Sequence, residues 1–569
     1  MRFLLSVILI ISAFHNLSSQ SVLEKEGLIK VATVKEGVYK IDLAFIESAG
    51  LNAQEIDPNR IQVYGMPGGH IPQSNAVAYP IDPQSIPVKI EANQNNIFES
   101  SESVYFYADA IQNIKYDFEE ETYQYSNNLY SDSLYFFIDF NAEEINLIEN
   151  IDSSEGSADK VINWYDAVYF HEIDETNILR SGRQWFGESF NINRTQNFPF
   201  ELSNDLVPSK DIALITQYMA QTYNSANLNI GLNEFDLVSE ELPTVSDFTV
   251  FPYAVKGKIV KNSSAVNTTI LSGKELNVQV SHEALGSGRS EGYLDFLFLT
   301  VPEKLKFHDQ QIIIRNRAFQ QIGDYQLKFE GLNSSHSVWE VSDLMDYKEL
   351  NIQNQLFNFS QSEELKERKF VVFDESTANE LTFVKEVSSQ SLKNNNSPEY
   401  LIITYDGFAQ LANQLADFRR SYNNYEVEVA PVSKIFDEFG SGRRDVSAIR
   451  NYIRYFHQKN PDKLKYVLML GAASYDYKDR VNNNTNLVPV YQSRNSLHPV
   501  FTYASDDFYG FMEESEGVWE EVFNNIDDVD IGIGRIPATS LKQATNTINK
   551  IIHYESSPQV FNKWRNDLY

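Results

Sequence analysis

Cysteine is absent from this chain of 569 residues. Disulfide bonds are therefore excluded, and the folded protein must be stabilised by packed cores or bound cations. Positive charge is also scarce, because 47 Lys and Arg stand against 79 Asp and Glu, which gives a formal net charge of −32. That charge repels nucleic acids and anionic lipid surfaces, so the sequence disfavours a nucleic-acid-binding role.

Long apolar runs are missing except at the N-terminus. Arg2 precedes the apolar stretch 3–14 (FLLSVILIISAF), which is followed by the small and polar residues 17–20. This pattern predicts a secretory signal peptide over residues 1–19 and hence an exported protein. No later run approaches the ~20 apolar residues that cross a bilayer, so we expect no transmembrane segment in the mature chain.

Motifs of zinc and serine chemistry are missing too. There is no HExxH and no paired-histidine spacing, which argues against a zinc hydrolase. The Gly-Ser-Gly segments at 286–288 and 440–442 lack the G-x-S-x-G pattern of a nucleophile elbow, and flexible connection is the simpler interpretation. An acidic exported chain is compatible with structural calcium, although no D-x-[DN]-x-[DN]-G loop occurs, so the metal content stays open.

The organisation of the chain changes along its length. The chain is too long for one hydrophobic core, and domains of ~100–200 residues suggest three or four units. With 37 Phe and 32 Tyr in the chain, short apolar-aromatic runs are separated by turn residues as far as residue 387. We predict an N-terminal β-rich domain over 20–150 and one or two β-sandwiches over 151–387. The polar, Asn-rich segment 388–398 (SSQSLKNNNSP) is typical of a linker.

After the linker the hydrophobic period changes from two to 3.6. Amphipathic helical segments alternate with apolar runs of the strand type at 400–404, 427–430, 466–470 and 531–534. This alternation predicts an α/β domain over 399–569 with a parallel sheet and right-handed crossovers. Ligands of such sheets gather beyond the carboxyl ends of the strands, which here are Asp406, 471–479 and 535–537.

Four carboxylates near these ends are candidates for the rim of an active site. Asp506 and Asp507 precede Tyr509 in the segment DDFYG. Two carboxylates at neighbouring positions repel each other unless a cation, hydrogen-bond donors or water stabilise them. The pair could therefore coordinate calcium or position a loop near the active-site rim. The alternative is that it caps a turn before a strand. Asp476 and Asp479 follow the predicted strand at 466–470. There they either contact a substrate or cap a turn.

Arg183, Trp185 and Glu188 form an aromatic and charged group in the β-rich region. Docking of this region onto another domain and simple core packing are both compatible with such a group. A carbohydrate-binding β-sandwich is a weaker hypothesis, because aromatic residues at a surface cannot be told from core aromatics in the sequence. Exposure of Trp164 and Trp185 in one groove would support it.

A family resemblance rests on motifs that occur in matching order and spacing. Those of the C-terminal region are LIITYDGF (401–408), VSKIFDEFGSGRRDVSAIRNYI (432–453), YVLMLGAASYDYKD (466–479), YASDDFYG (503–510), DIGIGRIPA (530–538), IIHYE (551–555) and Trp564-Arg565. This region resembles the gingipain-type cysteine peptidases. The upstream motifs are similar to the C-terminal signal peptidase of the type IX secretion system, and they are GVYKIDL (37–43), DPNRIQVYG (57–65) and SGRQWFGESF (181–190).

The resemblance implies a caspase-like α/β fold in which a His and a later Cys form the catalytic pair. In the family both residues follow the segments matched here, so they would lie beyond Tyr569. We therefore expect a catalytic domain that is incomplete at the C-terminus, and a chain that is inactive alone. The family's enzyme at this branch removes C-terminal sorting domains from exported cargo and joins the cargo to a surface glycolipid through an acyl-enzyme, a chemistry that requires no cofactor.

The implied partners are exported proteins with C-terminal sorting domains and components of an outer-membrane secretion system. The implied location is the outer membrane or cell surface of a Gram-negative bacterium. A second hypothesis is a non-catalytic β-rich binding or assembly module of that system, with an inert α/β region. An in-frame His and Cys downstream would favour the enzyme, and a natural end at Tyr569 would favour the module. A parallel sheet cut before its last strands leaves an open edge, so we expect the α/β region to be unstable by itself.

Overall fold

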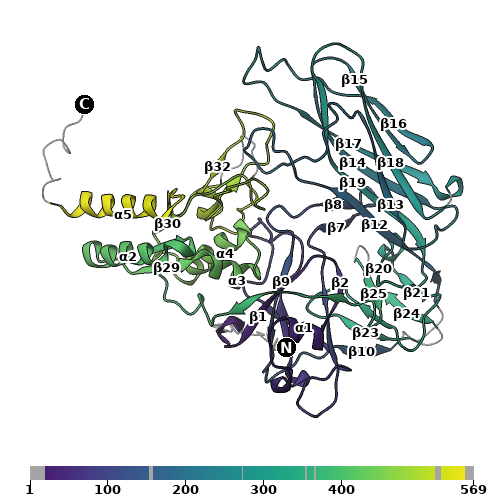
Figure 1. Cartoon of the computed structure of the whole chain (residues 1–569), viewed down its shortest axis with the longest axis horizontal. Coiled ribbons are helices and arrows are strands. Elements are labelled where there is room, and N and C mark those ends of the chain that lie inside the picture. Colours follow the sequence, from purple (N-terminus) through teal and green to yellow (C-terminus); the bar gives the residue numbers. More distant parts are fainter. Residues whose placement is uncertain are drawn as a thin grey trace, which may run out of the picture.

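The computed structural model describes residues 20–152, 158–271, 273–352, 355–363, 367–519 and 527–557. The predicted signal peptide at 1–19 and the Trp564-Arg565 motif lie outside these residues. The described chain forms β-rich modules followed by an α/β domain with a parallel sheet, so the predicted fold class is confirmed. Figure 1 shows the α/β domain, in green and yellow, beside the β-rich modules. No helix within these ranges is long and apolar enough to cross a membrane.

The N-terminal module packs two sheets around an aromatic core. Their strand orders are β27-β1-β9-β3-β4 and β26-β2-β6-β5. Val31, Phe106 and Phe136 point between the sheets and are fully buried. The elements are β1 Leu28–Thr33, β2 Gly37–Asp42, α1 Leu43–Ser48, β3 Gln62–Gly65, β4 Gln84–Ile86, β5 Lys89–Glu91, β6 Ser103–Ala108, β9 Leu134–Asp139, β26 Asn379–Glu380 and β27 Thr382–Val387, with a separate hairpin of β7 Asn113–Asp117 and β8 Thr122–Ser126.

The central module is an antiparallel β-sandwich with the sheets β12-β19-β14-β17 and β13-β18-β15-β16. Leu228, Ile230 and Leu232 of one strand are buried, whereas the intervening residues are partly exposed, which is the period of two expected for a half-buried strand. The strands are β12 Trp164–Glu172, β13 Thr195–Glu201, β14 Asp211–Thr222, β15 Ala226–Leu232, β16 Phe235–Glu241, β17 Lys258–Asn267, β18 Glu275–Ala284 and β19 Ser290–Lys304.

A third β-rich module lies below the sandwich in Figure 1 and has its own core, which includes Ile314, Tyr325 and Phe370. Its two sheets have the orders β10-β23-β22-β25-β20 and β11-β21-β24. The strands are β10 Glu149–Asp152, β11 Lys160–Ile162, β20 Ile312–Arg315, β21 Gly323–Lys328, β22 Ser337–Glu340, β23 Lys348–Asn351, β24 Leu356–Gln361 and β25 Lys369–Phe373.

Strand pairing joins parts of the chain that are far apart in sequence. Leu28 of β1 lies opposite Val387 of β27, and Glu149 of β10 lies opposite Lys348 of β23. Residues 382–387 therefore complete a sheet of the N-terminal module, although they directly precede the predicted linker. These two sheets therefore combine strands from distant parts of the chain. The domain boundaries predicted from the sequence, at residues 150, 387 and 398, stay predictions.

The α/β domain has a parallel sheet with the order β29-β28-β30-β33. Successive residues of β28 belong to different cores: Ile402 packs on one face of the sheet, and Leu401 and Ile403 pack on the other. The elements are β28 Tyr400–Thr404, α2 Ala409–Asn423, β29 Val427–Pro431, α3 Val432–Gly440, α4 Val446–Lys459, β30 Tyr466–Leu470, β31 Tyr491–Gln492, β32 Ala504–Ser505, β33 Gly532–Ile536 and α5 Leu541–Ser556.

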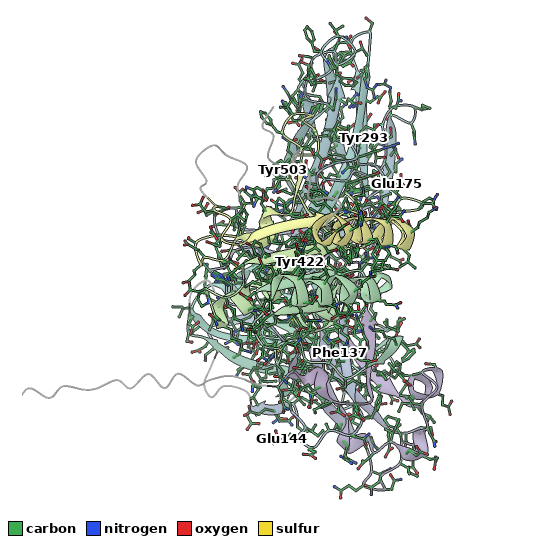
Figure 2. All side chains as sticks on the ribbon, turned by 90° about the vertical axis from the view of Figure 1, so that its left-hand side faces the viewer. Phe137, Glu144, Glu175, Tyr293, Tyr422 and Tyr503 are labelled. Carbon is green, nitrogen blue, oxygen red and sulfur yellow. The ribbon has the colours of Figure 1, made fainter. Side chains whose placement is uncertain are left out.

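Helices cover both faces of this sheet, as buried parallel sheets require. Leu415 of α2 and Ile548 of α5 pack with Ile402, whereas Ile435 of α3 and Ile449 of α4 pack on the opposite face. Figure 2 shows α5 and α2 side by side with Tyr422 between them, and the Tyr422 hydroxyl donates a hydrogen bond to the carbonyl of Glu555 (2.7 Å). The candidate site lies at the carboxyl ends of β28, β30 and β33.

Candidate functional site

The carboxyl ends of β28, β30 and β33 meet at one edge of the parallel sheet. The Tyr405 amide donates to the Leu470 carbonyl, and the Gly471 amide donates to the Ile536 carbonyl, each at 3.0 Å. Gly471 has a φ of +150°, and a Cβ at this position would come within 2.9 Å of Val488. A glycine is therefore needed where the chain leaves β30 and turns along this edge. We call this edge, with the loops 471–490 and 503–511, the rim.

Arg535 organises the rim from strand β33. Its Nε and Nη2 donate to the two carboxylate oxygens of Asp506, at 2.8 and 2.6 Å. Its other hydrogen bonds go to the carbonyls of Gly471 (2.8 Å), Val488 (2.7 Å) and Pro489 (3.0 Å). One guanidinium thus joins the start and the end of the loop after β30 to the segment after β32, because its planar fork can serve several acceptors in fixed directions.

Asp507 and Tyr509 of the DDFYG group differ in their surroundings, and Tyr509 shares the Pro489 carbonyl with Arg535. Asp507 is exposed in the short 3-10 helix Asp507–Gly510, where its amide donates to the Ser505 hydroxyl (3.2 Å). Tyr509 is fully buried, and its hydroxyl donates to the Pro489 carbonyl (2.7 Å). Burial raises the pKa of Tyr509 well above its usual value, so this phenol stays neutral. The two neighbouring carboxylates therefore have different surroundings, and the cation paired with Asp506 is Arg535.

Asp476 and Asp479 lie in the loop after β30. Asp476 is buried, and its carboxylate accepts from the amides of Lys478 (3.2 Å) and Val481 (2.7 Å), which is a turn-capping arrangement. Asp479 has a positive φ of 56° and forms an exposed ion pair with Arg444 (3.0 Å). In the structure Asp476 holds the loop together from inside, and Asp479 lies on its outer surface.

Two basic residues of the same loop connect it to both β-rich neighbours. The Lys478 ammonium lies 2.9 Å from Asp132 of the N-terminal module and 3.6 Å from Asp174 of the sandwich. Arg480 contacts the same two carboxylates, at 3.2 and 3.1 Å. Neither residue was expected at the site from the sequence, because the run DYKDR (476–480) has the composition of a solvated turn. The rim loop is thereby attached to the N-terminal module and to the sandwich.

The group Arg183, Trp185 and Glu188 is divided between two surroundings. The Arg183 guanidinium lies over the ring of Tyr491 (5.7 Å), and Trp185 stacks on Tyr475 at a centroid distance of 5.6 Å. These two side chains therefore lie against the α/β domain. Glu188 instead lies 2.6 Å from His171 within the sandwich.

Trp164 does not share a groove with Trp185. It is buried in the core of the third module, whereas Trp185 stacks on the α/β domain. The two tryptophans are therefore not exposed together in one groove, as a carbohydrate-binding site would have required.

A loop of the N-terminal module is held by arginines of the α/β domain. Arg443 donates to the carbonyls of Pro67 and Gly69, each at 3.0 Å, and to the Tyr79 hydroxyl (2.6 Å). Arg450 donates to the carbonyls of Gln73 and Pro72. Both guanidinium groups are almost completely buried, and burial lowers the pKa of Arg450 to about 9. Arg450 lies beside Ile449 and Ile453 on a predicted helix, and a charged residue among apolar ones needs a buried partner, so the sequence carried a signal for Arg450. Arg443 precedes that helix and had no such signal.

The described residues contain no group of three or more His, Cys, Asp or Glu side chains arranged to hold a metal ion. Asp506, the member of the acidic pair that is partly buried, is engaged by Arg535. Structural calcium stays a prediction.

Residues 393–569 match the model of peptidase family C25. Residues 393–569 are a domain of that family. The gingipain-type resemblance of the C-terminal motifs is confirmed by this match. The rim of the C25 domain contains no cysteine, since the whole chain has none.

The fold of the chain is similar to that of dimeric latent PorU from Porphyromonas gingivalis, with a TM-score of 0.81 and 20% sequence identity. The similarity covers 96% of this chain and 51% of PorU, so the chain spans about half the length of that protein. At this identity the likeness shows the fold, and it extends from the C25 domain to the β-rich modules.

Two carbohydrate-binding modules share short stretches of β-structure with the chain. They are a family 35 module from Clostridium thermocellum (13% identity, 24% of this chain and 95% of the module) and the CBM36-1 domain of a xylanase from the hindgut metagenome of Trinervitermes trinervoides (9% identity, 23% and 96%). Both have a TM-score of 0.15, which is too low to support an inference about this protein. No curated protein matches the sequence.

Proposed function

We propose that this chain supplies the β-rich modules and part of the catalytic domain of a secretion-linked cysteine endopeptidase and transpeptidase. The observation that carries the proposal is the match of residues 393–569 to peptidase family C25. The fold shared with PorU over 96% of the chain supports it, because that likeness includes the β-rich modules as well as the C25 domain. A structural likeness limited to the C25 domain would fit any peptidase of the family.

In this proposal a thiolate attacks the peptide carbonyl that precedes the sorting domain of an exported protein and forms a thioester. The peptide C–N bond breaks, and the sorting domain leaves as an amine that is protonated by the imidazolium. An amine, in place of water, then attacks the thioester and releases the thiolate, so that the cargo is attached to the cell surface. The chain has no cysteine, so the thiol comes from residues other than these 569. The chain itself contributes the rim, where Arg535 and Asp506 hold the loops that follow β30 and β32.

The proposed partners follow from this function. They are exported proteins that carry C-terminal sorting domains and components of an outer-membrane secretion system, and the proposed location is the outer membrane or cell surface of a Gram-negative bacterium. The signal-peptide pattern at residues 1–19 supports export. No cofactor is needed for thiol and imidazole chemistry, because both groups are side chains.

The experiment is to isolate the natural protein with an antibody against residues 20–150 and to treat it with an iodoacetamide-based thiol probe. We expect an intact mass well above the 65.3 kDa of this chain, one probe-labelled peptide, and peptide-cleaving activity that the probe abolishes. The matched control is a recombinant protein of these 569 residues, which has no cysteine and must remain unlabelled.

Two results would overturn the proposal. One is a natural protein whose mass is that of this chain less its signal peptide. The other is a larger protein that the probe neither labels nor inhibits. Either result would favour a non-catalytic β-rich binding or assembly module of the secretion system, with the C25 domain retained as a scaffold.

A further inference from the structure

A cavity of about 350 Å³ lies where the N-terminal module, the sandwich and the C25 domain meet. Tyr125 of the N-terminal hairpin forms one wall, and Glu172 and Asp295 of the sandwich form another. Lys478 and Arg480 from the rim loop of the C25 domain close it. The proposed function assigns no role to Tyr125, Glu172 or Asp295.

A β-bulge aims Asp295 into this cavity. In the pairing of β14 with β19, Gln217 lies opposite Phe296 while the next residue, Tyr218, lies opposite Leu294. Asp295 is therefore the extra residue of the bulge, and its carboxylate accepts a hydrogen bond from Gln217 Nε2 (2.6 Å). Strict alternation would have turned this side chain towards the sandwich core, where Leu294 and Leu297 lie. Bulges commonly re-aim one side chain in this way.

Glu172 is the second carboxyl group in the cavity. It lies opposite Phe296 at the end of β12, and its Oε2 is buried without a hydrogen bond. The Tyr125 hydroxyl and the charge of Lys478 favour the ionised form of this carboxyl group, but its loss of hydration opposes ionisation more strongly. Burial, reinforced by the charges of Asp174 and Asp295, raises the pKa of Glu172 to about 8. Burial likewise raises the pKa of Asp295 to about 7.

The neighbouring modules are what bury these two groups. The Tyr125 ring packs against Phe296 at 5.3 Å and Phe298 at 5.4 Å, which holds the hairpin over the end of the sheet. On the other side, the ion pairs of Lys478 and Arg480 with Asp174 hold the rim loop against the sandwich. The remaining charged groups that face the cavity are Arg183 and Lys261 of the sandwich and Asp476 and Arg494 of the C25 domain.

We propose that this three-module contact is a pH-sensitive switch, which is closed while Glu172 and Asp295 are protonated and loosens when both ionise. Loosening returns the two carboxylates to water and releases the rim loop around Lys478 and Arg480 from the sandwich. The sign follows from linkage: both carboxyl groups bind a proton more tightly in the closed state than when they are solvated. The closed state is therefore favoured at low pH and loses that advantage as the pH rises through about 7 to 8.

The test is hydrogen exchange of the full chain, read in peptides that cover residues 473–486 and 168–176. Rates are corrected for the intrinsic effect of pH on amide exchange. We expect protection of both segments to fall about tenfold or more between about pH 6 and about pH 9, since each ionising group contributes up to a factor of ten per pH unit. The double variant E172Q/D295N should keep its protection across this range, because it has no proton to lose at either position.

The matched control is E283Q, which changes an exposed carboxylate of the same sandwich and should show the wild-type pH profile. Protection of the wild-type segments that does not change between these pH values would overturn the proposal without any variant. An unchanged pH-dependent loss of protection in E172Q/D295N would overturn it as well, because other groups would then be responsible.

Discussion

The guanidinium of Arg535 and the carboxylate of Asp506 form two parallel hydrogen bonds, of 2.8 and 2.6 Å, at the carboxyl edge of the parallel sheet. Both side chains are largely buried, with 12% and 19% of their surface exposed. The pair joins strand β33 to the 503–511 loop, and the same guanidinium holds Gly471 and Val488. The positions of the rim loops therefore depend on a residue of strand β33.

Replacing Asp506 by Asn should destabilise the C25 domain by about 1–3 kcal/mol, because Arg535 would keep its buried charge without a counter-charge. The matched control is Asp507→Asn, which changes the exposed neighbour and should stay within about 0.5 kcal/mol of the wild type. Urea-induced unfolding of the full chain, followed by hydrogen exchange of residues 503–511, measures the difference. Equal losses in the two variants would contradict the role given to the ion pair.

Replacing Arg443 by Lys should loosen the N-terminal module from the C25 domain. One ammonium cannot reach the carbonyls of Pro67 and Gly69 and the Tyr79 hydroxyl together, so buried acceptors would lose their donors at a cost of about 2–4 kcal/mol. Faster proteolytic cleavage within residues 67–79 is the expected result. Arg444→Lys is the control, since Arg444 is more exposed and pairs with Asp479; cleavage at the same rate in both variants would refute the prediction.

The sandwich should lose stability in acid because of His282. This imidazole is buried between the Tyr218 hydroxyl (2.9 Å) and the Ser290 hydroxyl (2.7 Å), and burial lowers its pKa to about 4. The native state resists protonation, so the contribution of the neutral ring is complete above about pH 6.5 and is lost as the pH falls towards 4. The expected loss is about 2 kcal/mol.

Histidine hydrogen–deuterium exchange and thermal unfolding between about pH 7 and about pH 4.5 test this. His282→Gln should show a flatter dependence of the unfolding temperature on pH, whereas His308→Gln, at an exposed position, should follow the wild type. An exchange midpoint of His282 near its usual value would show that the ring is accessible to protons in the folded protein.

Limited proteolysis of the full chain should not release a stable C25 domain. Arg443, Arg450 and Asp445 of that domain find their hydrogen-bond partners in residues 67–79 of the N-terminal module, including the Ile71 amide (3.2 Å from Asp445). Cutting between the modules would leave these groups buried or exposed without partners, and we expect rapid further digestion or aggregation. A protease-resistant fragment that begins near residue 393 would be the contrary result.

Much of the fold could be predicted because local patterns are strong where one face of an element is buried. The apolar runs at 400–404 and 466–470 are strands, and the helices between them cover the sheet as their period indicates. Buried parallel strands and amphipathic helices differ in the period of their apolar residues, and that period is read from neighbouring residues alone. The sequence also singled out Asp506 as a candidate for the active-site rim, and in the structure this carboxylate pairs with Arg535 of β33.

The partners of the site residues could not be predicted in the same way. Arg535 and Asp506 are 29 residues apart, and Lys478 and Asp132 are 346 residues apart, so no local pattern connects either pair. The pairing of β1 with β27 has the same origin, because edge-to-edge strand pairing depends on which strands the fold brings together.

By itself the amino-acid sequence determined the order and type of the elements, the change from β-rich modules to an α/β domain, the family of that domain and the absence of a thiol. These properties depend on composition and on the spacing of nearby residues. The tertiary structure alone decided which charges meet across modules and which carboxyl groups are cut off from water. Ion pairing and desolvation depend on distances in space, and those arise only when segments hundreds of residues apart pack together.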